Sequence, residues 1–328
     1  VDNPVDGAVV DELMRRALAA TAGTYPHPNP RVGAIVITPQ GVLRALAAHR
    51  GAGEAHAERL ALAELSETDG DTMIVTLEPC DHHGRTPPCT DAIIESGIAR
   101  VIVGTLDPDP RVRGSGMAKL RSAGIEVVES GLGSLVEAND PGYFHHRRTG
   151  RPLVTLKVAA TLDGQSAAAD GTSQWITSLQ AREDGHRIRS ENDVVIVGAG
   201  TVLSDDPTLT VRLEGYDGPQ PRPVIIAGTR DLPSDRRVFA RDPIVYRSSP
   251  AGEVDPAEVV RDLGERGIVA AMIEGGPSVA GSFLRSGVVD QIIWYVAARL
   301  ALGTGTPAIA GTFATMGDMR DITITDVV

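Results

Sequence analysis

Strand and helix patterns alternate along almost the whole of this 328-residue sequence, and this alternation limits the folds open to it. In the first half, runs rich in Val and Ile alternate with segments whose apolar residues recur at helical spacing. The strand-like runs are 31–38, 72–79, 99–107 and 125–130, and the helical patterns are 6–23, 54–65, 89–97 and 116–124. Such an order is typical of an α/β layered domain.

A break near Gly150 and Pro152 predicts a second domain, because both residues interrupt regular structure. After it come runs dense in Val and Ile, as in buried parallel strands: 153–161, 193–202, 222–229, 242–247, 268–276 and 291–300. We therefore expect domains at 1–149 and 150–328, which suits a chain too long for a typical single core. The basic cluster His145–Arg151 is expected to be a solvated linker.

Charge and composition exclude several kinds of partner. The formal net charge is −12 and aromatic residues are only 3% of the chain, whereas nucleic-acid binders usually carry a basic surface and single-strand binders carry aromatic platforms. No run approaches the roughly 18 apolar residues of a membrane helix. The acidic, polar start is unlike a signal peptide. We expect a cytoplasmic protein without nucleic-acid or membrane partners.

Both cysteines of the chain lie in one short stretch, "LEPCDHHGRTPPC", residues 77–89. They could form a disulfide, be two core thiols, or belong to a metal site, and a cytoplasmic location disfavours the first. Cys80 follows a strand-like run and Cys89 opens a helical one, so the two can meet where these elements end. Because a helix N-terminus favours an anion, we expect the thiol of Cys89 to ionise more easily there. Zinc binds thiolates.

A third candidate ligand stands upstream in "EAHAERL", where His56 precedes Glu58 by two positions. The order H-x-E…P-C…C is that of zinc nucleobase deaminases, in which the Glu is not a ligand but a general acid and base. Three protein ligands leave the fourth position of a catalytic zinc open for water. Because residues two apart do not share a helix face, His56 and Glu58 converge only over a helix N-terminus. Taken alone, His56 would more often be a surface or capping histidine.

The spacing of the cysteines, with eight residues between them instead of two, is itself informative. With "YPHPNPRVGAIV" and "AGEAHAE", this stretch resembles the deaminase half of the bifunctional riboflavin-biosynthesis deaminase/reductase family. Further on, "TLDGQSAAADGTSQWITS", "GAGTVLSDDPTLTVR" and "EGGPSVAGSFL" resemble the reductase half. The resemblance covers nearly the whole chain. One departure is "GVLRALAAHRGAGEAH", where Arg and Ala replace a more usual glycine-rich approach to the ligand histidine.

The resemblance implies an α/β protein with an N-terminal cytidine-deaminase-like α/β/α layered domain and a C-terminal dihydrofolate-reductase-like α/β domain. It implies zinc-dependent hydrolytic deamination of 2,5-diamino-6-ribosylamino-4(3H)-pyrimidinone 5′-phosphate. Reduction of the ribosyl side chain to ribityl by NADPH would follow. The expected cofactors are thus Zn²⁺ and NADPH, and the expected assembly is a homo-oligomer, a dimer.

The resemblance also assigns roles to single residues. His56, Cys80 and Cys89 would hold zinc, and Glu58 would transfer the proton. The implied substrate contacts are Asn29, Ser173, Arg189, Leu209, Arg212 and Glu274. The implied cofactor contacts are Ala159, Trp175, Thr201, Asp205, Gly275, Gly276, Pro277 and Ser278. Further candidates near the two sites are His49, His82, His83, Arg85, Lys157 and Asp163.

Simple structural roles compete with several of these assignments. Asn29 stands between two prolines and could be only a turn residue, and a lone arginine such as Arg212 is usually a surface residue. Glycine-rich strand–helix turns cradle anions, but many such turns bind nothing. At the level of the whole chain, a tRNA or nucleoside deaminase with an unrelated second domain is one alternative. A structural zinc module joined to a binding domain is another, although structural zinc usually has four protein ligands.

Overall fold

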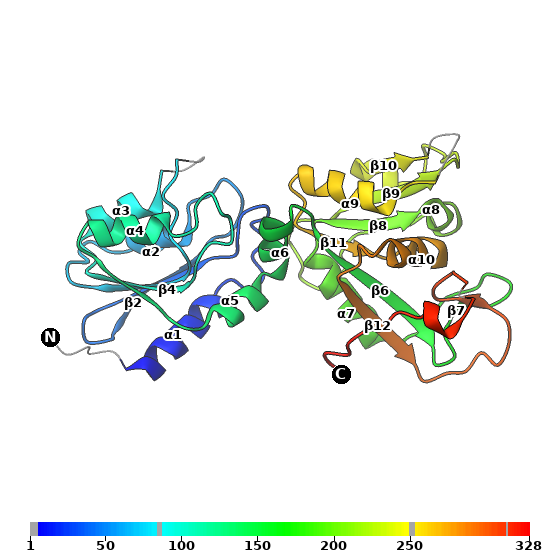
Figure 1. The fold of residues 1–328 in the computed structure, drawn as a ribbon, viewed down its shortest axis with the longest axis horizontal. Helices are drawn as coiled ribbons and strands as arrows, with labels where there is room; N and C mark the ends of the chain where they lie inside the picture. Colours follow the sequence, from blue (N-terminus) through cyan, green and yellow to red (C-terminus); the bar gives the residue numbers. More distant parts are fainter. Residues whose placement is uncertain (1–5, 84–86, 249–252, 313) are drawn as a thin grey trace.

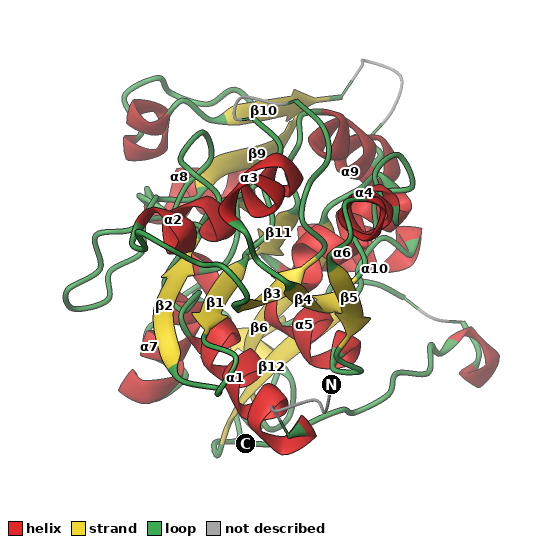
Figure 2. Cartoon of the chain, turned by 90° about the vertical axis from the view of Figure 1, so that its left-hand side faces the viewer, coloured by secondary structure: helices red, strands yellow, loops and turns green. Residues whose placement is uncertain are grey.

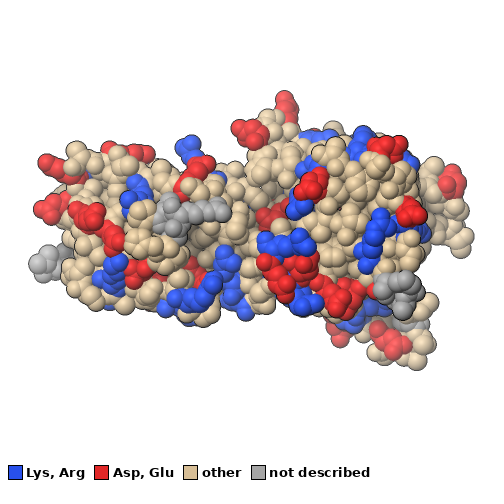
Figure 3. All heavy atoms as spheres, turned by 90° about the horizontal axis from the view of Figure 1, so that it is seen from above, with Lys and Arg blue, Asp and Glu red and all other residues tan. Residues whose placement is uncertain are grey.

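The computed structural model describes residues 6–83, 87–248, 253–312 and 314–328. Two lobes lie side by side along the long axis, each built on its own sheet, with the N-terminal half of the chain in one and the C-terminal half in the other (Figure 1). Within these ranges no helix combines the length and the apolar character needed to cross a membrane. Acidic and basic side chains are interspersed over the face shown in Figure 3.

The first lobe is built on a five-stranded sheet in the order β2-β1-β3-β4-β5. β1 is antiparallel to both of its neighbours, and β3, β4 and β5 are mutually parallel. The strands are β1 Gly33–Ile37, β2 Leu43–Ala48, β3 Thr72–Leu77, β4 Arg100–Thr105 and β5 Glu126–Glu129. β1 and β3 are buried along their whole length, because helices cover both faces of the sheet (Figure 2). Burial on both faces explains why these strands read as continuous apolar runs.

Five helices complete the layers of this lobe. They are α1 Gly7–Ala19, α2 Ala57–Ala63, α3 Cys89–Ser96, α4 Ser115–Ser122 and α5 Gly133–Asn139. α2, α3 and α4 lie on one face of the sheet, and α1 and α5 lie on the other (Figure 1). Asp6 caps α1 by accepting from the Ala8 N–H, and the apolar stripe of α1, including Met14, packs against Ile35 and Ile74. The result is the expected α/β/α layering.

The second lobe is built on a six-stranded sheet in the order β10-β9-β8-β11-β6-β12, in which all neighbours are parallel. The strands are β6 Leu153–Thr161, β8 Val194–Gly198, β9 Arg222–Gly228, β10 Ile244–Arg247, β11 Ala270–Ile273 and β12 Gln291–Ala297. A separate antiparallel pair joins β7 Gln165–Ala167 to β13 Thr306–Pro307. The turns that leave β8 and β11 emerge from neighbouring carboxyl ends, which is where open α/β sheets bind ligands.

The helical segments of this lobe are α7 Leu179–Ser190, α8 Ala199–Asp205, α9 Pro256–Glu265, α10 Pro277–Ser286 and the 3₁₀ helices η1 Arg237–Arg241 and η2 Met316–Asp318. α9 and α10 bury Leu263 and Phe283 against a core that includes Ile196 and Ile273. A second cluster around Val202 and Val238 connects α8 and η1 with the strands. The core of the lobe is therefore shared between sheet and helices.

A helix, α6 (Pro141–Thr149), joins the two lobes and lies between them (Figure 1). Asp140 caps it, and its buried aromatic residues pack in the core of the first lobe. On the other side, the His146 Nε2 lies 3.1 Å from the carbonyl oxygen of Gly264. The expectation of a solvated linker over His145–Arg151 is therefore wrong as far as the end of α6. Contacts with both lobes stabilise a helix where the basic composition suggested solvent.

Candidate active sites

Three candidate metal ligands converge where β3 ends and where α2 and α3 begin. His56 is the N-cap residue of α2, Cys80 follows β3, and Cys89 is the first residue of α3. The His56 Nδ1 lies 3.6 Å from the Cys80 Sγ and 3.3 Å from the Cys89 Sγ. The three ligand atoms all lie within 4.8 Å of one another, and both cysteines are free. The group lies over a helix N-terminus, as convergence of His56 with Glu58 requires.

The start of α3, which was expected to favour an anion on Cys89, faces the sulfur of Cys80. The N–H of Cys89, at the start of α3, points at the Cys80 Sγ at 3.4 Å. Hydrogen bonds from the Cys89 side chain and from His56 lower the pKa of Cys80 to about 4. The interaction with the Cys80 sulfur, together with burial, raises the pKa of Cys89. The helix N-terminus therefore favours an anion on the facing Cys80 sulfur.

Glu58 is buried in the first turn of α2, with 3% of its surface exposed. Burial and the negative charge of Cys80 raise the pKa of its carboxyl group. Its Oε2 atom is buried and has no hydrogen-bond partner among the described residues. Buried carboxylate oxygens normally have partners, so this oxygen is suited to take one from outside the chain. Such a position, two residues from His56, suits a general acid and base.

The donor set fits zinc. One imidazole nitrogen and two cysteine sulfurs form the three-ligand set of a catalytic zinc site, which keeps a fourth position open. Among the described residues no fourth His, Cys, Asp or Glu completes the group, as a structural zinc site would require. The easily ionised thiol of Cys80 supplies the anion that zinc prefers.

Asn29 reaches the ligand group through His49. Its Nδ2 atom lies 3.2 Å from the His49 Nε2, and the His49 Nδ1 lies 3.1 Å from the carbonyl oxygen of Ala55. Because Nδ1 faces a carbonyl it carries the proton, and Nε2 accepts from the Asn29 amide. The His49 ring meets the His56 ring edge-on at a centroid distance of 5.1 Å. The Oδ1 atom of Asn29 is left as an acceptor.

The remaining candidates near this site are less constrained. His82 and His83 are exposed, and Arg85 lies outside the described residues. The unusual approach to His56 forms β2, in which Arg44 pairs with the buried Asp71 at 2.5 Å. Arg44 is therefore part of strand β2, and its side chain pairs with Asp71 instead of lining the site.

Glu78 fixes the strand end that carries Cys80, and nothing in the sequence pattern had singled it out. Its buried carboxylate accepts from four backbone N–H groups within residues 107–117, at 2.9–3.3 Å. A Cβ atom on Gly116 would lie 1.9 Å from the carbonyl oxygen of Pro79, so only glycine lets α4 approach this closely. Glu78 thus ties α4 to the loop that holds a zinc ligand.

In the second lobe, Arg189 of α7 is buried against Glu274 at the end of β11. Its Nε and Nη2 atoms donate to the two carboxylate oxygens at 2.7 and 2.8 Å, and Nη1 donates to the carbonyl of Thr210 at 2.6 Å. Burial would raise the pKa of Glu274, but Arg189 and Lys157 outweigh it and the pKa is lowered. Arg189 therefore holds Glu274 ionised and fixed in orientation.

Arg212 and His186 lie beside this pair. The backbone N–H of Arg212 donates to the His186 Nδ1 at 3.3 Å. Burial and the charges of Arg189 and Arg212 lower the pKa of His186 to about 4, so the imidazole is neutral near neutral pH. The side chain of Arg212 is exposed. Sequence reasoning had singled out both arginines and missed His186, although its i,i+3 spacing to Arg189 places both on one helix face.

Two strand–helix turns meet next to these residues, at the carboxyl ends of β8 and β11. A Cβ atom on Gly276 would lie 4.0 Å from the Thr201 Oγ1, and one on Gly275 would lie 2.7 Å from the Cβ of Val279. Glycine at 275 therefore allows the turn to pack against its own helix. The first residues of α10 are Pro277 and Ser278. The turn places backbone N–H groups at a helix N-terminus, the usual cradle for a phosphate.

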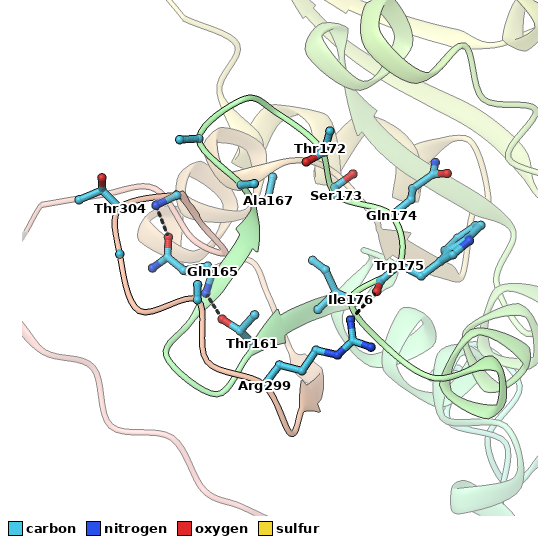
Figure 4. Close-up of a pocket in the computed structure, with 15 residues that line it drawn as sticks. Thr161, Gln165, Ala167, Thr172, Ser173, Gln174, Trp175, Ile176, Arg299 and Thr304 are labelled. Carbon is cyan, nitrogen blue, oxygen red and sulfur yellow. Dashed lines mark hydrogen bonds between the residues drawn. The ribbon is translucent and has the colours of Figure 1, made fainter.

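A pocket of about 370 Å³ opens between the segment after β7 and the loop after β12 (Figure 4). Ser173, Trp175 and Thr161 line it. Arg299 donates to the Trp175 carbonyl at 3.3 Å, and the Trp175 ring, 60% exposed, lies 4.2 Å from the guanidinium carbon of Arg182. The pocket thus carries the hydroxyl groups of Thr161 and Ser173, and the Trp175 ring at its border packs against Arg182.

The other predicted reductase residues are placed as follows. Ala159 precedes Thr161 by two positions on β6, so both face the same side of the sheet. Leu209 is buried in a core cluster, and Asp205 is exposed at the end of α8. Asp163 accepts from the backbone N–H groups at the start of the loop after β12, so it holds the border of the pocket.

The structure thus brings the deaminase candidates together in one lobe. In the other lobe it gathers one group around Glu274, a second at the Gly275–Gly276 turn and a third at the pocket of Trp175.

Comparisons with known proteins agree with this division. Residues 9–105 match the cytidine and deoxycytidylate deaminase zinc-binding region, and residues 152–320 match the RibD C-terminal domain. The riboflavin biosynthesis protein RibD of Mycobacterium tuberculosis is 41% identical over 303 residues, which cover 90% of this chain and 87% of the relative. The solved structure of Acinetobacter baumannii RibD is similar with a TM-score of 0.90 and 32% identity, covering 99% of this chain and 96% of that one. A solved diaminohydroxyphosphoribosylaminopyrimidine deaminase/5-amino-6-(5-phosphoribosylamino)uracil reductase from Thermotoga maritima has a TM-score of 0.86 and 36% identity, covering 98% and 95%.

Fold and site together define a zinc-dependent deaminase joined in one chain to an NADPH-dependent reductase. The chain belongs to the RibD family of bifunctional enzymes of riboflavin biosynthesis. The predicted family, fold class and pair of cofactors are thereby confirmed. Neither a tRNA deaminase with an unrelated appendage nor a structural zinc module fits a reductase domain of this family.

Proposed function

We propose that the chain deaminates 2,5-diamino-6-ribosylamino-4(3H)-pyrimidinone 5′-phosphate in its first lobe. In its second lobe, we propose, it reduces the ribosyl side chain of the product to ribityl. The observation that carries the proposal is the group of His56, Cys80 and Cys89 beside the buried Glu58, whose Oε2 atom has no hydrogen-bond partner among the described residues. A solved relative is named as both a deaminase and a reductase. The proposed domains are 1–149 and 150–328, which meet at the end of α6.

In the deaminase half, we assign zinc to His56, Cys80 and Cys89. When bound, zinc supplies Lewis-acid chemistry that makes water nucleophilic near neutral pH. Glu58 is assigned as the group that takes a proton from the attacking water and delivers it to the departing nitrogen, so that water enters and ammonia leaves. Its raised pKa suits this exchange, because the group must both accept and release a proton. Asn29 would meet the pyrimidine edge with its free Oδ1.

In the reductase half, the cofactor supplies a hydride, and the chain supplies binding and orientation. We assign Arg212 to the substrate phosphate, because its side chain is exposed beside a buried ion pair. Glu274, held by Arg189, would bind hydroxyl groups of the substrate. We assign the Gly275–Gly276 turn and Thr201 to the phosphates of NADPH, with Ser173 and Trp175 lining the approach to the reacting atoms.

Ammonia release tests the first activity most directly. The diaminopyrimidinone phosphate, cytidine and tRNA would be offered separately to the zinc-loaded chain. Release from the first alone, followed by product-dependent oxidation of NADPH, is the expected result. Release from cytidine or tRNA instead would contradict the proposal. A cytoplasmic location and a dimeric assembly are part of the proposal, and size-exclusion chromatography with light scattering tests the latter.

A further inference from the structure

The carboxylate of Asp193, in the second lobe, contacts residues of both lobes. Asp193 stands directly before β8, and its Oδ2 atom accepts from the backbone N–H groups of Val269 and Ala270 at 2.7 and 2.9 Å. Its Oδ1 atom is turned to the first lobe, where it accepts from the hydroxyl of Tyr25 at 2.8 Å and lies 3.4 Å from the Nδ1 of His27. One carboxylate is thus fixed to the second sheet and reaches a loop of the first lobe.

His27 lies between the carboxylates of Asp140 and Asp193. Its Nε2 atom lies 3.0 Å from the Oδ1 of Asp140, and the two side chains are only 3% and 4% exposed. Burial alone would lower the pKa of His27, but Asp140 and Asp193 outweigh it and raise the pKa to about 9. At neutral pH His27 is therefore an imidazolium within ion-pair distance of a carboxylate of each lobe, hydrogen-bonded to Asp140, while its Nδ1 makes no hydrogen bond to Asp193.

The same loop carries Asn29. Its backbone N–H donates to the Pro26 carbonyl at 3.0 Å, which closes a turn over His27, and the backbone N–H of Arg31 donates to the Asp140 Oδ2 at 2.9 Å. The turn is therefore held on both sides of Asn29. From Asn29 the contacts continue through His49 to His56.

We propose that Asp193 of the reductase half is a positioning residue for the deaminase site, acting through Tyr25 and His27 on the turn that presents Asn29. The inference rests on the proposed function in taking Asn29 as a pyrimidine contact. As a consequence, binding of the deaminase substrate depends on a side chain of the reductase domain, whereas reduction does not depend on the turn that carries Asn29.

Contacts that only hold the two lobes together would have different effects from the positioning contact of Asp193. α6 attaches the lobes through contacts such as His146 with Gly264, which touch neither site. Loss of simple attachment would lower the stability of the chain and affect both activities alike. Loss of a positioning contact would raise the Michaelis constant of deamination alone.

The test uses the full-length, zinc-loaded chain and steady-state kinetics of both reactions. Asp193→Asn removes the charge that faces His27 and keeps a carbonyl oxygen for the Val269 and Ala270 amides. Tyr25→Phe removes only the hydroxyl that reaches Asp193. The matched control is Tyr246→Phe, since Tyr246 also donates to a carboxylate, Asp262, at 2.5 Å, but within the second lobe.

We expect Asp193→Asn to raise the Michaelis constant of deamination about tenfold, and Tyr25→Phe about threefold, with a smaller change in kcat. Zinc content, reduction kinetics and the control variant should match the parent. In the double variant the two effects should not multiply, because both substitutions break one contact.

Three outcomes separate the possibilities. An unchanged Michaelis constant of deamination in Asp193→Asn and Tyr25→Phe, in a parent that deaminates, overturns the inference alone. Equal losses of both activities overturn it as well, because they indicate simple attachment. A parent that releases no ammonia from the diaminopyrimidinone phosphate overturns the proposed function itself.

Discussion

Arg189 and Glu274, 85 positions apart in sequence and both predicted substrate contacts, form a bidentate ion pair in the second lobe, with N···O distances of 2.7 and 2.8 Å. Both side chains are largely buried, at 10% and 14% exposed. Since a buried carboxylate without its partner is costly, Arg189 serves the site by keeping Glu274 ionised. Arg189 and Arg212 therefore differ in environment, one buried in an ion pair and one exposed, although both were expected to contact the substrate.

Arg189→Ala is expected to destabilise the chain by about 3–5 kcal/mol, because it leaves Glu274 buried without its cation. Urea unfolding followed by circular dichroism measures the change. The matched control is Arg187→Ala on the same helix, whose ion pairs with Asp184 and Glu191 are exposed. Its cost should stay below about 1 kcal/mol. Equal costs for the two variants would contradict the role given to the buried pair.

Arg212→Ala is expected to act on substrate binding. A charge-assisted contact to phosphate contributes roughly 1.5–3 kcal/mol, so the Michaelis constant of reduction should rise about tenfold to a hundredfold. NADPH affinity, measured by fluorescence titration, should not change. Arg222→Ala is the control, because Arg222 begins β9 at the opposite end of the parallel strands. A variant that loses NADPH and keeps its substrate would reverse the assignment of the two pockets.

Metal analysis of freshly purified protein should find about one zinc per chain, since the described residues hold one group of three suitable ligands. Removal of zinc by a chelator should abolish deamination and leave reduction unchanged. Cys80→Ser should lose zinc in the same way, because it removes one of the three ligand atoms. Zinc-free protein with both thiols oxidised would refute the metal assignment.

The strands other than β2, β7 and β13, together with helices α1 to α4, were predictable, because their patterns are local. β3 and β8 are apolar runs, and α1 has an apolar stripe. β2 was not predictable, since Leu43–Ala48 contains no β-branched residue and is a strand because it pairs with β1. α6 was missed for a similar reason: contacts with both lobes stabilise a segment of basic composition.

The zinc group was predictable from spacing, because three ligands and Glu58 lie within a short part of the chain. The contact of the Cys89 N–H with the Cys80 sulfur was not, since it depends on the direction of a single N–H in the folded loop. The contacts of Asp193 with Tyr25 and His27 join residues more than 160 positions apart, and no local pattern marks them.

Glu58→Gln keeps the shape of the side chain and removes its ability to carry a proton. Deamination should fall by at least about a hundredfold, the usual lower range for loss of a general acid and base. Zinc content should be unchanged, and NADPH-dependent reduction of the deaminated substrate should remain. Loss of both activities in a folded, zinc-loaded variant would indicate that the two sites are not separate.

The pH dependence of stability should report the ion pair between the lobes. The pKa of His27 is raised from 6.5 to about 9 in the folded chain, so its stabilising contribution is complete below pH 6.5 and is lost as pH rises through 9. The charged and polar groups that face it are Asp140 and Asp193, with Tyr25, Arg31 and His146 nearby.

The raised pKa of His27 corresponds to about 3 kcal/mol. His27→Gln lacks this contribution, so the difference in free energy of unfolding between parent and variant should shrink by about that amount between pH 6 and pH 10. Urea unfolding at both pH values measures it, and a difference that stays constant would show that His27 is not charged in the folded chain.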